Sequence, residues 1–376
     1  MKKLTILIAA IALVCFSVPA MAVDWNFYGS ARMATFYVSD DLGDGETASG
    51  DDGDTGVQWD LQGNSRLGAN VKAENIKGQF ELGLKGNGQG DVDVGTRRIY
   101  GVWNFGPGWM KVGKDYTPVS QFISGQVFDA DLGLLGVGTQ YGNRVGQIAF
   151  GFGGFEIALM TVDTRNVEAE FVVGGLTFNF SDGDVDKYLP KIEASWGMSF
   201  DAFSFGLQGG YQTYTVEDVE SLDDGDTNDV DVTSWTIGGD AGFNFGPGYV
   251  KASVSYGQNI GNAGWGIPGN RNAGGFGLWD GDDDLNDVDT LMGALVGGMK
   301  VSDMLSFEGG IGYRADDPDS DYALGDEKAT SINWYVQSVI ALAPGVYVIP
   351  EVGMFIGDKN YDDSDATSTF YLGGKW

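Results

Sequence analysis

The chain has 376 residues, a formal net charge of −31, one cysteine and no histidine. The absence of histidine excludes Ser-His-Asp and Cys-His catalysis, histidine-ligated zinc and a histidine switch near neutral pH. The strong negative charge argues against nucleic-acid binding, which needs a basic surface.

Residues 1–22 have the composition of an export signal. Lys2 and Lys3 precede an apolar stretch at residues 4–18, and Ala20 and Ala22 form a small-x-small cleavage site. We therefore expect a signal peptide at residues 1–22 and a mature domain at residues 23–376. The only cysteine, Cys15, would leave with the signal, so we predict a mature chain without disulfides or thiolate metal sites.

Apolar and polar residues alternate from residue 57 to residue 73. One face carries the apolar residues Val57, Trp59, Leu61, Leu67, Ala69 and Val71, and the other the polar residues Gln58, Asp60, Gln62, Asn64, Arg66 and Asn70. The pattern recurs at residues 79–85, 203–212 and 305–314, and it is longer than a typical soluble strand. After residue 22 no apolar run is long enough for a membrane helix, so a membrane location would require a closed barrel with a water-filled lumen.

Short turns and long polar segments follow one another along the chain. We expect short turns at residues 74–77, 105–108, 153–154, 201–202, 245–248, 302–304 and 343–345, and long loops at residues 39–56, 88–95, 116–138, 164–187, 215–231, 258–287, 315–328 and 357–366. These connections predict an all-β transmembrane antiparallel barrel of 16 strands. A strand-like segment at residues 167–180 is placed in the fourth long loop, and as an independent hairpin it would raise the count to 18.

Short motifs give a resemblance to a known family. Phe370, Leu372 and the terminal Trp376 share one face and resemble the last strand that the outer-membrane assembly machinery recognises. Residues 98–102, the Phe105-Gly106 turn and residues 111–118 resemble the general, non-specific bacterial porins, and residues 65–68 resemble the second strand of that family. The resemblance implies a trimeric barrel in the outer membrane, whose third loop folds into the pore.

The same resemblance implies a constriction. Residues 116–138 would form the constriction loop with Asp129 and Asp131, and the facing wall would carry Arg32, Arg66 and Arg98. Acids that face bases across a narrow lumen set up a transverse field that filters ions and orients dipolar solutes. The family's Pro-Glu-Phe-Gly-type loop tip is missing, and residues 127–133 stand in its place. In the alternative interpretation, these charges only hydrate the lumen wall.

Most carboxylates fall in the long loops. They predict either a negative vestibule that concentrates cations or a solvated surface, with the clusters Asp51, Asp52 and Asp54, then Asp223, Asp224 and Asp226, and then Asp282, Asp283 and Asp284. No metal site is predicted, because the Asp-x-Asp-x-Asp runs at 182–186 and 280–284 lack the glycine and glutamate of a calcium loop. Loose binding of divalent cations, including bridging to lipopolysaccharide, stays open, and so does the sign of ion selectivity.

The function that the resemblance implies is passive diffusion of ions and small hydrophilic solutes across the outer membrane, without a cofactor. The expected partners are membrane lipid and lipopolysaccharide, two further copies of the chain, and the barrel assembly machinery. The main alternative is a substrate-specific channel of the sugar type, which would need a run of lumen aromatics. A barrel enzyme and an exported β-sandwich protein are weaker alternatives, because the first generally needs histidine and the second lacks the aromatic last strand.

Overall fold

The computed structural model describes residues 23–41, 55–86, 91–164, 171–173, 176–178, 185–220, 227–266, 274–279, 285–319, 327–359 and 367–376. The first part of the chain contains β1 (Asp24–Ser30), β2 (Met33–Asp41), β3 (Thr55–Leu61), β4 (Ser65–Lys72), β5 (Ile76–Gly86), β6 (Val92–Asn104), β7 (Trp109–Tyr116), the single turn α2 (Phe128–Asp131), β8 (Arg144–Phe152) and β9 (Phe155–Met160). The predicted signal peptide at residues 1–22 lies outside the described residues.

The rest of the chain consists of strands as well. They are β10 (Phe171–Val173), β11 (Leu176–Phe178), β12 (Val185–Asp186), β13 (Lys191–Phe200), β14 (Phe203–Glu220), β15 (Thr227–Phe245), β16 (Gly248–Gln258), β17 (Leu278–Trp279), β18 (Leu285–Asn286), β19 (Val288–Lys300), β20 (Leu305–Pro318), β21 (Ala329–Ala343), β22 (Val346–Lys359) and β23 (Thr367–Lys375). None of the helices within the described ranges is both long and apolar enough to span a membrane.

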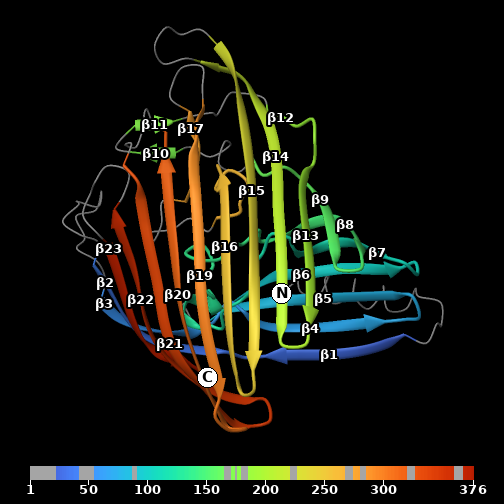
Figure 1. Ribbon diagram of the computed structural model, residues 1–376, viewed down its shortest axis with the longest axis vertical. Helices are drawn as coiled ribbons and strands as arrows, with labels where there is room; N and C mark the ends of the chain where they lie inside the picture. The colour runs from blue at the N-terminus through green and yellow to red at the C-terminus, as the bar shows by residue number, and fades with distance from the viewer. Residues whose placement is uncertain are drawn as a thin grey trace.

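Nineteen strands form one antiparallel sheet (Figure 1). Only residues 31–32 separate β1 from β2, and only residues 62–64 separate β3 from β4. Gln62 N donates a hydrogen bond to Arg32 O at 2.8 Å, which continues the pairing across both interruptions, so each of these pairs is counted as one strand. β12 extends β13, since both pair with β14. Merged in this way, the nineteen described strands of the sheet correspond to sixteen, the number that the sequence predicts.

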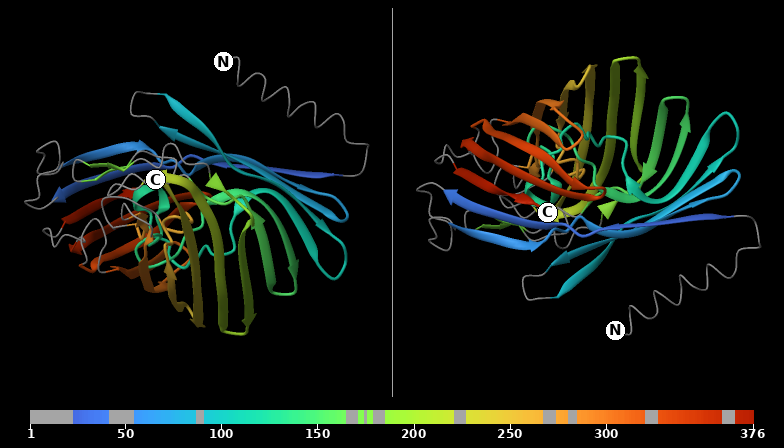
Figure 2. Two further views of the ribbon diagram at one scale, coloured as in Figure 1. Left: turned by 90° about the horizontal axis from the view of Figure 1, so that it is seen from above. Right: turned by 90° about the horizontal axis from the view of Figure 1, so that it is seen from below.

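The first and last strands meet. β2 pairs with β23 on one side and with β3 on the other, and the backbone of Met33 exchanges hydrogen bonds with that of Trp376. The two end-on views show the sheet curling around the segment between β7 and β8 (Figure 2). The fold is barrel-like, although β1 pairs only with β4 and β3 only with β2 among the described strands. Of the predicted strand-like segment at 167–180, the described parts β10 and β11 pair only with each other and add no strand to the sheet.

The sheet has its apolar side outward. On β14 and β15, Leu207 and Ile237 are exposed, whereas the polar Gln208 and Thr236 on the opposite face are buried. Apolar residues gain nothing from facing water, so this outer face suits contact with lipid, and the polar inner face suits a hydrated lumen. Period-two alternation of the sequence therefore produces an inside-out barrel.

This polarity reverses toward the far end of β14 and β15. Inward-facing Tyr214, Val216, Val230 and Val232 are buried against one another, whereas Thr215 on the outer face hydrogen-bonds Asp231 at 2.6 Å. Polar outward residues and an apolar interior are the arrangement of a protein in water. Beyond Tyr211 the two strands therefore have the polarity of a hairpin in water, and β14 and β15 extend past their neighbours at the top of Figure 1.

Candidate pore constriction

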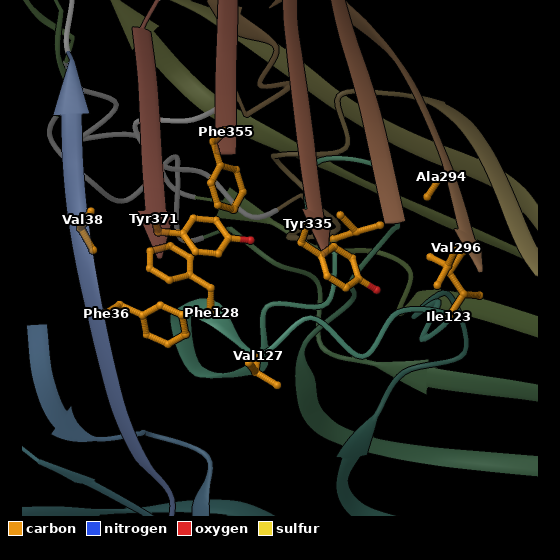
Figure 3. Close-up of a cluster of buried hydrophobic side chains, with 11 residues drawn as sticks. Phe36, Val38, Ile123, Val127, Phe128, Ala294, Val296, Tyr335, Phe355 and Tyr371 are labelled. Atoms are coloured by element: carbon orange, nitrogen blue, oxygen red, sulfur yellow. The ribbon is translucent and has the colours of Figure 1, made fainter. Parts of the chain in front are cut away.

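Residues 117–143, here called the third loop, lie inside the sheet between β7 and β8. Ile123, Val127, Phe128 and Leu134 of the loop pack against inward-facing side chains of β2, β19 and β21–β23. Phe128 is stacked on Tyr371 with ring centroids 3.9 Å apart and meets the edge of Phe36 at 5.1 Å. Figure 3 shows Phe128 between these two rings. The predicted fold, with the third loop in the pore, is confirmed.

Polar contacts fix the same segment. The buried Glu351 carboxylate on β22 accepts hydrogen bonds from Val127 N at 2.7 Å and Phe128 N at 3.0 Å. Gln126 Nε2 donates to the Tyr371 hydroxyl at 2.7 Å and to Asn333 at 3.2 Å. Buried polar groups without partners are costly, so these contacts hold the loop in one register against the wall.

The tip of the loop reaches the place where the first and last strands meet. Asp131 Oδ2 lies 2.6 Å from Arg32 Nη1, and Oδ1 lies 2.5 Å from Lys375 Nζ. Arg32 and Asp131 were predicted at the constriction, whereas Lys375 was not, although its spacing of four residues from Tyr371 places Lys375 on the same inner face. Asp129 belongs to the same turn and is exposed, with a positive φ of 49°.

A second group of charges lines the wall of β4–β8. Glu81 is bound by Arg66 at 3.3 Å and by Arg97 at 2.8 Å, and Asp115 is bound by Arg98 at 2.7 Å and by Lys111 at 3.1 Å. Arg97 was missed because strict alternation places it on the lipid face. A register shift between β5 and β6, after Glu81, lets Arg97 reach the same acid as Arg66.

Tyr116, the last residue of β7, joins this group to Arg144. The Arg144 guanidinium donates to the Tyr116 hydroxyl at 3.0 Å and lies 5.1 Å from the ring centroid, and Arg98 lies 5.4 Å from the same centroid. Among the described residues Arg144 forms no salt bridge. We call this connected cluster the basic wall; its five bases are Arg66, Arg97, Arg98, Lys111 and Arg144, and its three acids are Glu81, Asp115 and Glu156.

The third loop carries an aromatic group beside the basic wall. Phe122 is 52% exposed, and its ring lies 4.9 Å from Tyr116 and 6.1 Å from Tyr141. On the short-turn side of the loop, a cavity of about 620 Å³ is bordered by Asp131, Lys375, Glu308 and Tyr249. Open space and charged side chains therefore meet at the level of the third loop.

The predicted acidic vestibule falls on parts of the chain that the structure does not describe. Its residues Asp51, Asp52, Asp54, Asp223, Asp224, Asp226, Asp282, Asp283 and Asp284 all lie outside the described residues. In the part of the chain that is described, no group of three acidic, histidine or cysteine side chains could hold a metal ion.

Comparisons with known proteins agree with this architecture. The outer membrane channel DcaP of Acinetobacter baumannii superposes with a TM-score of 0.67 at 16% identity, covering 94% of this chain and 97% of that one. An anion-selective porin from Comamonas acidovorans has a TM-score of 0.55 at 16% identity, covering 94% and 98%. OmpT of Vibrio cholerae in a trimer form has a TM-score of 0.53 at 13% identity, covering 94% and 99%.

A search of curated proteins found no match. A family model described as Gram-negative porin, however, matches residues 9–348, nearly the whole chain. The resemblance drawn from short motifs and the expected outer-membrane location are thereby confirmed. The chain belongs to the Gram-negative porin family, and it is an outer-membrane channel protein.

Proposed function

We propose that the protein is a passive diffusion channel for ions and small hydrophilic solutes, and that its narrowest part favours anions. The observation that carries the proposal is the basic wall beside the third loop, where five basic side chains meet three carboxylates. Fixed charges at a constriction act on a permeating ion at short range and in a reduced dielectric. Acidic residues on the long loops act from farther away and are screened by salt.

The pairing of Asp131 with Arg32 and Lys375 supports the same preference for anions. One carboxylate on the loop tip faces two cations on the barrel wall, 2.6 and 2.5 Å away. At the loop tip, Asp131 thus faces two wall cations and Asp129 lies in the same turn, and opposite charges that face each other in this way create the transverse field expected of a porin constriction.

The alternative function is a substrate-specific channel. It is favoured by the exposed ring of Phe122, which packs against Tyr116 and the buried Tyr141 and offers a surface on which a flat or sugar-like solute can stack. A general pore passes solutes in proportion to concentration, whereas a specific one saturates. Liposome swelling over a range of solute concentrations separates these two functions.

The assembly is also part of the proposal. We propose a homotrimer on the model of the OmpT trimer form, inserted by the assembly machinery through β23 and surrounded by lipid and lipopolysaccharide. No catalytic activity is proposed, and no cofactor.

The decisive experiment is single-channel recording of the folded protein in a planar bilayer under a salt gradient. We expect stepwise openings in groups of three, and a reversal potential whose sign shows that anions permeate more readily than cations. A folded, inserted protein without openings would refute the open channel, and a reversal potential of cation sign would refute the role of the basic wall.

A further inference from the structure

A second segment besides the third loop folds into the barrel. Residues 259–266 follow β16 and were expected to begin a long outer loop, yet Ile260, Ala263 and Trp265 are at most 1% exposed. Backbone bonds from Trp265 N to Ile260 O, at 2.9 Å, and from Gly264 N to Gly261 O, also at 2.9 Å, close them into a compact turn. We call this segment the inward turn.

The inward turn rests on the inner wall of β13 and β14. Lys191 Nζ donates to Ala263 O at 2.5 Å, and Gln212 Nε2 donates to Asn262 O at 3.0 Å. The Trp265 ring occupies the space beside Gly210, where an added Cβ would lie 2.5 Å from the ring. Glycine at this inward position of β14 therefore makes room for the tryptophan.

One buried carboxylate joins the inward turn to the third loop. Glu193 on β13 is fully buried, and it accepts hydrogen bonds from Trp265 Nε1 at 2.7 Å and from Val119 N at 3.1 Å. Lys191 lies 3.3 Å from the same carboxylate and compensates its charge. A buried acid with three partners is a strong, specific anchor, because removal of any partner leaves a costly buried group.

The turn also contacts the other end of the third loop. Asn143 Nδ2 donates to Gly264 O at 3.2 Å, and Tyr141 N donates to Trp265 O at 3.4 Å. Val119 and Asn143 lie near the two ends of the loop, so the inward turn supports the place where the loop enters and leaves the lumen.

We propose that the inward turn is a second constriction element, held in place by the positioning residues Glu193 and Lys191. It fills the lumen along β13 and β14, so that permeating solutes are directed past the basic wall on β4–β8. The aperture and the anion preference are then set by two loops together. This inference rests on the proposed channel function, since it concerns the width and selectivity of that pore.

Two variants test it from opposite sides of one contact. Trp265→Ala removes the ring from the wall, and Gly210→Ala places a methyl group where the ring sits. In both we expect single-channel conductance to rise about twofold, because current scales with the open area of the narrowest part, and the anion preference to fall. The matched controls are Trp235→Ala and Gly209→Ala, which make the same changes on the lipid face of β15 and β14.

Heat-modifiable gel mobility establishes that each variant is folded. If Trp265→Ala does not fold, Gly210→Ala still tests the proposal. Folded variants with wild-type conductance and reversal potential would overturn the proposal, as would equal changes in the lipid-face controls. A wild-type protein without openings would instead refute the channel function itself, so the two failures are distinguishable.

Discussion

Arg32 and Lys375, which lie near opposite ends of the chain, bind the two carboxylate oxygens of the same side chain, Asp131. The third loop thus closes an ionic bridge across the place where the first and last strands pair. The Asp131 carboxylate in this position holds the loop tip against the wall and partly neutralises the charge of two cations in the lumen.

We expect Asp131→Asn to make the channel more anion-selective, because it leaves Arg32 and Lys375 without their shared acid. The three side chains are 13–29% exposed, so the loss of loop docking is only of the order of 1 kcal/mol. Reversal potentials under a salt gradient measure the change. Asp129→Asn removes the same charge two residues away, and an equal shift in that control would contradict a specific role for Asp131.

Phe128→Ala should release the third loop. The ring is 2% exposed between Tyr371 and Phe36, and truncation of such an aromatic costs about 3–5 kcal/mol. The expected result is noisy open-channel current and faster proteolysis within the loop. Phe122→Ala, on the same loop but 52% exposed, is the control and should leave proteolysis unchanged. A quiet Phe128→Ala channel would show that the polar anchors to Glu351 are sufficient.

Arg144→Gln should reduce the anion preference without unfolding the protein. Arg144 contacts Tyr116 but forms no salt bridge with any described residue, so its replacement leaves no carboxylate unpaired. The shift should be largest at low salt, because screening weakens it at high ionic strength. Lys300→Gln removes the same charge at the exposed rim, where Lys300 pairs with Asp303, and should have a smaller effect. A larger effect of Lys300→Gln would place the selective region at the rim.

Asp287, just before β19, should make stability depend on pH. Its pKa is raised above the ordinary value by burial, and nearby Asp319 and Asp289 add to this, whereas the hydrogen bond from Asn259 opposes it. A raised pKa in the folded state means that Asp287 contributes stability below its unfolded pKa of about 4, and that this is lost as pH rises through the folded value. Asp287→Asn should therefore melt higher than wild type at pH 7.

The expected gain is under about 1 kcal/mol, because the side chain is only half-buried. Thermal unfolding followed by circular dichroism at pH 7 and pH 3 measures it, and the two proteins should converge at pH 3. A lower melting temperature of Asp287→Asn at pH 7 would show that the hydrogen bond from Asn259 outweighs the burial of the charge.

Much of the fold follows from period-two alternation alone. The inside-out faces of β14 and β15 can be read from residues such as Leu207 and Gln208, and the sixteen strands follow from the spacing of turns. The third loop in the pore came from the family resemblance, since nothing in its own sequence shows where Phe128 packs.

The rest of the site depends on geometry that alternation does not contain. Arg97 faces inward because of a register shift, and a shift of one residue leaves no mark on a pattern of polar and apolar residues. The inward turn was read as an outer loop because its neighbours in the chain are polar. The signal that could have found it is the apolar pair Ile260 and Trp265 within a loop, but only the wall residues Gly210 and Glu193 explain where that pair goes.

Along β14 and β15 the outward side chains change from apolar to polar, as expected where strands pass the edge of a lipid layer. Residues 214–220 continue past that change, and a strand advances about 3.4 Å per residue, so the hairpin extends roughly 20 Å beyond it. Its inward residues Tyr214, Val216, Val230 and Val232 form a small apolar cluster with Val162 of another segment, and this packing braces the hairpin. Antibodies and bacteriophages that approach the cell would meet this ridge before they reach the mouth of the pore, and a peptide grafted onto it would be displayed on a rigid support.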